Sequence, residues 1–371
     1  MKRCFILCNI QNPKSNYIVS GFAGSNVSLY LGRLMSFFSE VVFVNVGAPN
    51  QAWKLKQKNK EYKCEEGTIV EFPYGPSFFP TRIKAKLMIR NAIKYIISNR
   101  QPKDFLLIYH SISFSFYYQL LINRFGINNV VIHVAELYSE VGNICYSIKR
   151  EIKKLRVFEK YIFMSCGIKD RIVKDNKKKY MYLYGVYKTG QLIEKVGDDN
   201  NNVNLVYAGT ASKIKGGLFS ALSALQYLPK NIKLHVFCSA DSSLIKKINN
   251  SGAIYEGYAD EKTLNAFMCS CHIGLATQNP NLPFNNSSFP SKIVNYLACG
   301  LNVVSSKSIS VTKSPFKDYV YFYEEDSTGN NLAKAILKSS ILINKEKNIQ
   351  FIEKLDNEAK LQIRRLFEGQ L

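Results

Sequence analysis

The chain has 371 residues, a length that favours two domains of ordinary size. Hydrophobic residues make up 46% of it and charged residues 21%, a composition that is typical of globular proteins and excludes a disordered chain. The formal net charge is +22. The nine cysteines lack the spacing of a disulfide framework or a metal motif, which favours a reducing cytosol and excludes a small secreted scaffold.

The apolar stretches predict buried elements instead of a signal peptide or a membrane span. The first stretch, residues 4–10, is short and interrupted by Asn9. The longest stretch without an acidic or basic residue, Phe105 to Asn123, has only 13 apolar residues among 19. A span needs about 20 predominantly apolar residues. We therefore predict a strand over Phe105 to Tyr109, a turn, and a helix over about 116–124.

Short β-branched runs alternate with helical patterns in both halves, which is typical of parallel sheets with crossover helices. In the first half the predicted strands are Cys4 to Asn9, Val41 to Val46, Phe105 to Tyr109, Val130 to Val134 and Tyr161 to Ser165, and the predicted loops are Gly47 to Gly67 and Pro73 to Pro80. In the second half the predicted strands are Asn204 to Ala208, Lys233 to Phe237, Ala253 to Tyr255, His272 to Ala276 and Asn302 to Ser305.

A polar, Asn-rich stretch separates the two alternating patterns. We take residues 191–202 as a linker between a first domain over 1–190 and a second over 203–345. Late helices are predicted over Asn331 to Ile343 and Ile349 to Phe367. Residues 346–371 would form a C-terminal helix that packs back towards the first domain.

The positive charge is concentrated in the first half. Residues 1–190 hold 30 Lys and Arg against 12 Asp and Glu, whereas the rest of the chain holds 20 against 16. An acidic partner is therefore expected to meet the first half, whether a membrane surface, a diphosphate-linked lipid or a nucleic acid. Residues 149–160 form a smaller basic stretch of the same kind.

One helical pattern sharpens this expectation. Apolar residues between Ala85 and Ile97 recur at helical spacing. A neighbouring face carries four basic residues, Arg82, Lys86, Arg90 and Lys94. Two interpretations remain open: a surface helix packed on the domain core with solvated lysines, or a basic helix that rests on an anionic membrane.

Two segments of the second half have the form of phosphate-binding turns. Residues 207–217 follow a strand, open a helix, and combine Gly209, Gly216 and Gly217 with two lysines. Glycines allow close backbone approach, and a helix N-terminus favours an anion. Residues 288–300 place Ser291 and Lys292 in a first helical turn. A lysine opposes the helix dipole there, unless an anion binds. Ordinary capped helices remain the alternative for both segments.

These segments together resemble one known family. Gly209 with Lys215-Gly216, Glu256-Gly257-Tyr258, and Phe289-Pro290-Ser291-Lys292 with residues 296–304 are similar to the nucleotide-sugar half of retaining GT-B glycosyltransferases of the group-1 or family-4 type. Order and spacing agree over about residues 203–306. The resemblance implies an α/β fold of two facing Rossmann-like domains with C-terminal helices, the donor bound by the second domain and the acceptor by the first.

The resemblance also assigns roles to residues of the second half. It implies that Lys215 and Lys292 stabilise the leaving diphosphate, that Gly209 and Thr210 allow its close approach, and that Tyr258 lies near the base. Ser291 and Asn295 complete the implied donor site. Thr210 stands where many relatives have Arg. Ser287 and Asn295 stand where many relatives have glutamates eight residues apart, which bears on the identity of the donor. Asn295 is expected to contact the donor ribose.

In the first half the resemblance is looser. Residues 21–26, with Gly24, Ser25 and Asn26, are similar to the family's glycine-rich acceptor loop ahead of a helix. Residues 131–140 are similar to the strand end that carries an acidic residue, which implies catalytic roles for His133 and Glu136. A spacing of three puts these two residues on opposite faces of a strand unless the strand ends between them. A core histidine is the alternative interpretation of His133.

The expected activity is transfer of a sugar, with retention of configuration, from a UDP- or GDP-linked donor to a lipid-linked glycan, as in bacterial capsule or O-antigen synthesis. No cofactor and no metal is expected. The run Cys269-Ser270-Cys271-His272 is expected to be buried at the start of an apolar strand and not to bind a metal. The expected location is the cytoplasm, peripherally on the anionic inner face of the plasma membrane. The alternatives are a basic nucleic-acid-binding protein, although no such motif is present, and a GT-B-like epimerase or phosphorylase.

Overall fold

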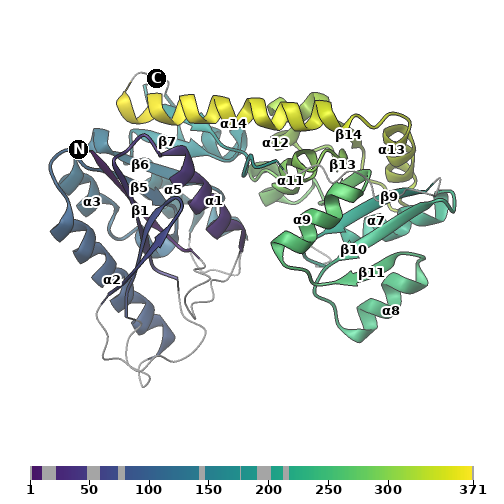
Figure 1. Ribbon diagram of the computed structural model, residues 1–371, viewed down its shortest axis with the longest axis horizontal. Coiled ribbons are helices and arrows are strands. Elements are labelled where there is room, and N and C mark those ends of the chain that lie inside the picture. Colours follow the sequence, from purple (N-terminus) through teal and green to yellow (C-terminus); the bar gives the residue numbers. More distant parts are fainter. Residues whose placement is uncertain are drawn as a thin grey trace. The chain divides into compact units, whose positions relative to one another are not determined.

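A computed structural model of the chain describes residues 2–10, 22–47, 59–73, 80–141, 147–175, 177–189, 202–211 and 217–369. The chain forms two compact units (Figure 1). Unit 1 consists of Met1–Leu183 with Glu358–Leu371, and unit 2 of Tyr184–Asn357. The boundary falls ahead of the predicted linker, which lies outside the described residues except for Asn202.

Unit 1 is built on an eight-stranded sheet with the order β3-β4-β2-β1-β5-β6-β7-β8, in which only β3 runs antiparallel to its neighbour. The strands are β1 Arg3–Cys8, β2 Glu40–Asn45, β3 Lys60–Cys64, β4 Gly67–Glu71, β5 Phe105–Tyr109, β6 Val130–Val134, β7 Lys160–Phe163 and β8 Lys179–Tyr182. The described helices are α1 Phe22–Leu34, α2 Thr81–Asn99, α3 Tyr118–Phe125, α4 Tyr138–Val141, α5 Ile148–Leu155 and α6 Cys166–Ile172, with the 3-10 turns η1 Ile112–Phe114 and η2 Ile127–Asn129.

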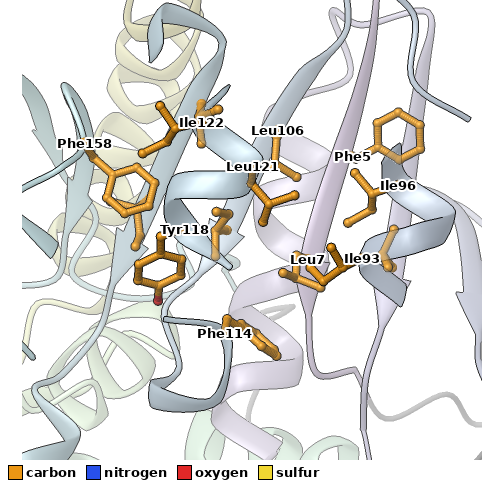
Figure 2. Packing of buried hydrophobic residues seen from close by; sticks show 14 of the residues in the cluster. Phe5, Leu7, Ile93, Ile96, Leu106, Phe114, Tyr118, Leu121, Ile122 and Phe158 are labelled. Carbon is orange, nitrogen blue, oxygen red and sulfur yellow. The ribbon is translucent and has the colours of Figure 1, made fainter. Parts of the chain in front are cut away.

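The two faces of this sheet bury different side chains because successive strand residues point to opposite sides. On one face, Phe5, Leu7 and Leu106 pack against α2 and α3, as Figure 2 shows. The apolar residues of α2 that the sequence analysis singled out lie in this core. On the other face α1 packs so closely on β2 that a Cβ added to Gly32 would lie 2.2 Å from the Phe43 ring.

The end of the last helix, α14 Lys345–Glu368, also belongs to unit 1. The Phe367 ring lies 5.4 Å from that of Phe38 and 5.5 Å from that of Phe105, measured between ring centroids. Lys160 donates a buried hydrogen bond to the Phe367 carbonyl. Unit 1 is therefore discontinuous in sequence: its core includes residues from both ends of the chain.

Unit 2 is built on a six-stranded parallel sheet with the order β11-β10-β9-β12-β13-β14. The strands are β9 Val203–Ala208, β10 Ile232–Phe237, β11 Ile254–Gly257, β12 Ile273–Ala276, β13 Asn302–Ser306 and β14 Val320–Tyr323. The helices are α7 Leu218–Ala224, α8 Ser242–Asn250, α9 Glu261–Ser270, α10 Pro283–Ser287, α11 Lys292–Ala298, α12 Ile309–Thr312, α13 Asn330–Ser340 and the start of α14, with the 3-10 turns η3 Leu225–Tyr227 and η4 Pro315–Tyr319.

Tyr296 fixes α11 on this sheet. Its ring lies against β12, where a Cβ added to Gly274 would come within 2.2 Å of it. Its hydroxyl accepts a hydrogen bond from the Ala208 backbone N–H at 3.1 Å and donates one to the Leu275 carbonyl at 3.4 Å. A glycine at position 274 is thus required by the close approach of the ring, and one side chain bridges two neighbouring strands.

The predicted fold class is confirmed: both units are Rossmann-like α/β domains, followed by C-terminal helices. The interpretation of residues 105–123 as strand, turn and helix is also confirmed. The predicted loop over 47–67 contains β3, whose charged sequence KEYKC alternates in exposure at the edge of the sheet and has no apolar pattern. Among the described residues, no helix is long and apolar enough to cross a bilayer.

Replacing Gly274 with Ala should destabilise unit 2 by about 1–3 kcal/mol, because the added methyl group overlaps the Tyr296 ring. Thermal or urea unfolding measures the effect. In the double variant Gly274→Ala with Tyr296→Leu the overlap is removed, so the loss should be smaller than the sum of the two single losses. Strict additivity would show that the ring and residue 274 do not interact.

Candidate functional site

In unit 2 the predicted donor residues Gly209 and Lys292 lie where successive strands change from one side of β9 to the other. The strand order places β9 in the middle, with β10 and β11 on one side and β12, β13 and β14 on the other. In open parallel sheets, ligands bind outside the carboxyl ends of the strands at such a switch point. Here the switch point lies between β9 and β12. The segments that follow these two strands begin at Gly209 and Thr277.

Lys292 reaches the end of β9. A Cβ added to Gly209 would lie 2.5 Å from Lys292 Nζ, so any other residue there would require the end of the lysine side chain to move. Gly209 also has a φ of +144°, a backbone conformation that residues with a side chain rarely adopt. The Lys292 ammonium lies 4.2 Å from the centre of the Tyr207 ring. The sequence analysis named Gly209 and Lys292 separately, and the structure brings them into contact.

The Lys292 ammonium is held in a dry environment, although the residue as a whole is only partly buried. It makes no hydrogen bond or ion pair with any residue that the structure describes, and it packs on the Tyr207 ring face. Burial lowers the pKa of Lys292 to about 8. A desolvated ammonium with little compensation is costly, which makes this position a candidate for binding an anion.

The start of α7 packs closely on the end of β12. Gly217 has a φ of +68°, and a Cβ added there would overlap the Thr277 carbonyl at 1.6 Å. The Thr277 hydroxyl donates to the Gly217 carbonyl at 2.8 Å. This packing fixes the backbone on either side of the switch point. Lys215, which the sequence analysis placed in the donor site, lies in the segment 212–216 outside the described residues.

The other predicted donor residues differ in exposure. Thr210 and Asn295 are exposed, and Tyr258 is 66% exposed. Ser291 precedes α11, and its side chain makes no capping hydrogen bond. Ser287 is buried in α10, where its hydroxyl donates to the Phe284 carbonyl. Of the two positions that stand where relatives carry glutamates, 295 is therefore open to solvent and 287 is not.

In unit 1 the corresponding switch point lies between β1 and β5. Tyr109 ends β5, and its ring centroid lies 5.0 Å from that of His133 on β6. The Tyr109 hydroxyl points towards α1, where it lies 3.5 Å from the position of a Cβ added to Gly24. The sequence analysis did not single out Tyr109, because an aromatic residue at a strand end has no distinctive pattern. The fold places it beside two predicted site residues.

His133 is a buried imidazole, and neither of its ring nitrogens has a hydrogen-bond partner among the described residues. Burial, with a smaller effect of His110, lowers the pKa of His133 to about 3, so the ring is neutral at neutral pH. β6 ends at Val134, between His133 and Glu136, so the two residues are not constrained to opposite faces of one strand. Burial raises the pKa of Tyr109, and the charge of Glu136 adds to this effect.

The predicted acceptor loop takes a different form. Gly24, Ser25 and Asn26 lie inside α1, which begins at Phe22, whereas the sequence analysis expected a loop ahead of the helix. The segment contains no proline, so nothing in it prevents an early helix start. Ser25 is buried, and the Ser28 hydroxyl donates to the Gly24 carbonyl at 2.8 Å. These residues therefore belong to the first turns of a helix that points at Tyr109.

The four basic residues of α2, Arg82, Lys86, Arg90 and Lys94, are all exposed. The apolar face of the helix is buried in the core of unit 1 and is not available to a bilayer. The apolar face of α2 thus packs on the domain core, whereas contact of its basic residues with a membrane stays a prediction. Any contact with a membrane must be electrostatic at this stripe, or must use other exposed apolar residues such as Ile83, Phe116 and Leu120.

The described residues hold no group of three or more His, Cys, Asp or Glu side chains that fits a metal ion. Cys269 and Cys271 are buried, as the sequence analysis expected from the alternation of the strand. His272 accepts a hydrogen bond from the Asn204 backbone N–H on Nδ1 at 3.0 Å. This histidine thus ties β9 to the start of β12, a structural role.

Comparison with known proteins gives similarity in structure only. No protein-family model and no curated protein matches the chain. Sucrose-phosphate synthase from Thermosynechococcus elongatus is 13% identical with a TM-score of 0.70, and covers 100% of this chain and 99% of that chain. The Escherichia coli trehalose-6-phosphate synthase bound with UDP-2-fluoro glucose is 11% identical with a TM-score of 0.64, covering 99% and 97%.

A UDP-forming α,α-trehalose-phosphate synthase from Burkholderia xenovorans, in complex with glucose-6-phosphate, is 8% identical with a TM-score of 0.65, covering 100% and 99%. At such identities the similarity establishes the fold, which is the GT-B fold of these synthases. The fold named in the sequence analysis is therefore confirmed over the full length of the chain.

Replacing Lys292 with Met should stabilise the ligand-free protein at pH 7 by roughly 1–3 kcal/mol, because the variant no longer buries a charge. The pKa of Lys292 is lower in the folded protein, about 8, than in the unfolded chain. The gain should thus be largest below pH 8 and shrink as the pH rises towards the ordinary lysine pKa. Unfolding of Lys334→Met, at an exposed position of α13, should show no such pH-dependent gain.

Proposed function

We propose that the chain is a retaining glycosyltransferase that takes a sugar from a nucleotide diphosphate donor held by unit 2. The observation that carries the proposal is the Lys292 ammonium, desolvated against the Gly209 backbone at the switch point of a six-stranded Rossmann-like sheet. This arrangement suits a diphosphate, because a close backbone and a buried cation together favour an anion. The GT-B fold supports the same class of reaction.

In the proposed mechanism, Lys292 stabilises the charge that develops on the leaving diphosphate. A cation in a site of low dielectric constant acts more strongly than one in water and needs no reorganisation during the reaction. Lys215 is proposed to share this task. Asn295, which is exposed one turn after Lys292, is proposed to contact the ribose, and Tyr258 the base. Retention is what the family resemblance implies.

The acceptor is proposed to bind at the strand ends of unit 1, near Gly24, Ser25 and Asn26. His133 is neutral there, so its proposed role is to donate or accept hydrogen bonds and not to supply a positive charge. Its two nitrogens without partners suit the hydroxyl groups of a sugar. Glu136, at the same end of the sheet, is the proposed group that interacts with the attacking hydroxyl.

We further propose that this acceptor is a lipid-linked glycan and that unit 1 rests on an anionic membrane while binding it. The excess of basic residues in positions 1–190 and the exposed stripe on α2 support this proposal. Phe116 is 72% exposed, with the Lys154 ammonium 4.0 Å from its ring centre. Such aromatic–cation pairs suit the membrane interface, where apolar and charged groups meet.

The solved structure with glucose-6-phosphate suggests another class of acceptor, a soluble sugar phosphate. Both acceptors carry phosphate, so the basic charge alone does not separate them. Binding to vesicles does, because a soluble acceptor requires no membrane surface.

Donor binding is tested by thermal shift with UDP, GDP, CMP and their sugars. A nucleotide that binds only the folded protein raises the melting temperature, and a concentration of 100 times Kd corresponds to about 2.7 kcal/mol. We expect a shift with UDP or GDP and its sugar, and a loss of most of it in Lys292→Met. No shift with any nucleotide would contradict the proposal. Isomerised donor without transfer would instead indicate an epimerase.

Membrane binding is tested by co-sedimentation with vesicles of anionic and of neutral lipid. A variant with Arg82, Lys86, Arg90 and Lys94 changed to Gln should bind anionic vesicles at least tenfold more weakly, because each basic residue near the surface contributes about 1 kcal/mol. High salt should weaken binding of the unmodified protein.

The matched control removes the same charge from exposed residues of α14, Lys354, Lys360, Arg364 and Arg365. Equal binding of both variants would overturn the assignment of the stripe, and a preference for duplex or single-stranded nucleic acid would point to that partner instead.

A further inference from the structure

Helix α5 carries one buried acid among its basic residues. Lys149, Arg150 and Lys153 are exposed, whereas Glu151 is only 1% exposed. An unpaired carboxylate at such a position would be strongly destabilising. The hydrogen bonds that Glu151 accepts therefore show which parts of unit 1 the buried carboxylate holds together.

Glu151 accepts its hydrogen bonds from a loop and from a histidine. Its Oε1 accepts from the Tyr138 backbone N–H at 2.9 Å and from His110 Nε2 at 2.8 Å. Its Oε2 accepts from the Ser139 backbone N–H at 3.0 Å and from the Ser139 hydroxyl. Burial alone would raise the pKa of Glu151, but the hydrogen bonds from His110 and Ser139 outweigh it and lower the pKa. The carboxylate thus holds the start of α4 as a capping anion does.

His110 extends the same network to a second strand. It follows β5 directly and is 1% exposed. Its Nδ1 lies 2.6 Å from the hydroxyl of Tyr118, which Figure 2 shows among the buried side chains of unit 1. Its backbone N–H donates to the His133 carbonyl at 2.8 Å. Because the carboxylate of Glu151 only accepts, His110 Nε2 carries a proton.

The network therefore holds the ends of β5 and β6 at fixed positions. On β5, His110 is the residue after Tyr109. After β6, the two backbone N–H groups that Glu151 binds lie at the start of α4, two and three residues after Glu136. His133, which accepts from the His110 backbone, lies three residues before Glu136. Tyr109, His133 and Glu136, which we place at the acceptor end of unit 1, thus all lie within three residues of a group in this network.

We propose that Glu151 and His110 are positioning residues for the acceptor site, which they reach only through the segment 135–139 and the end of β5. This inference rests on the proposed function, since it assumes that Glu136 and His133 meet the acceptor. Neither Glu151 nor His110 contacts the acceptor itself. A displacement of about 1 Å at a reacting group costs on the order of a hundredfold in rate, so rigid support of this kind is valuable.

The test compares Glu151→Gln with Glu140→Gln. The amide introduced by Glu151→Gln would present N–H groups to at least one of the N–H donors that now bind the carboxylate. Glu140 lies in the same helix α4 as the held residues, but its carboxylate pairs with the Arg171 side chain near the surface. In Glu151→Gln, hydrogen exchange of the amides in 134–141 should be at least tenfold faster, and in Glu140→Gln it should stay within twofold.

Turnover is measured as nucleoside diphosphate released from the UDP- or GDP-sugar that binds in the thermal-shift series, with water as the acceptor, because hydrolysis requires no lipid-linked glycan. In Glu151→Gln, kcat should fall at least tenfold, while the donor KM and the shift produced by the nucleoside diphosphate stay within twofold, because unit 2 is untouched. Turnover within twofold of the unmodified protein, or unchanged exchange over 134–141, would overturn the inference.

Two substitutions of His110 keep the test decisive if Glu151→Gln does not fold. His110→Gln retains an N–H donor near the position of Nε2 and should restore most of the turnover that His110→Ala loses. Equal losses in both would show that the donor at Nε2 does not support turnover, which would overturn the inference. Failure of UDP and GDP to bind the unmodified protein would contradict the proposed function, whereas the exchange measurements would still test the network.

Discussion

The bridge made by the Tyr296 hydroxyl is the contact on which the site of unit 2 depends. It joins the Ala208 N–H of β9 to the Leu275 carbonyl of β12, so α11 cannot slide along the sheet. Lys292 lies one helical turn before Tyr296 and on a similar face. The position of its ammonium over Gly209 follows from that anchor. The Tyr296 ring occupies the space beside Gly274, and the Lys292 ammonium occupies the space beside Gly209. The position of the cation thus depends on glycine at both places.

The two units use burial in opposite ways. In unit 2 burial leaves Lys292 with a pKa of about 8, so the group remains mostly charged at neutral pH and gains by meeting an anion. In unit 1 burial brings the pKa of His133 to about 3, so this ring is neutral and suits uncharged hydroxyl groups. The same physical effect, desolvation, thus suits the proposed donor site to charge and the proposed acceptor site to hydrogen bonding. The difference lies in the ordinary pKa of each group.

The sequence predicted most of the buried strands, and it missed β3, β4, β8 and β14. The apolar runs of β5 and β6 were predicted with their observed bounds, because strands covered on both faces are almost continuously apolar. The edge strands β3 and β8 are polar and gave no signal. Gly209 and Lys292 were named from their local motifs, but their contact joins positions 83 residues apart and depends on the order of the strands. The Glu151 network has no sequence pattern, since a glutamate in a basic helix is usually solvated.

The discontinuity of unit 1 has a consequence for how the protein is made. The ribosome synthesises residues 1–183 before all of unit 2, yet the aromatic side chains of Phe38 and Phe105 are covered by Phe367, which follows unit 2 in the sequence. Domains often fold as they emerge, N-terminal first. Here the first domain to be synthesised stays incomplete until Phe367 has been added, and its apolar surface stays uncovered during the synthesis of all of unit 2. A nascent chain that lacks Phe367 would leave this surface exposed to chaperones and proteases.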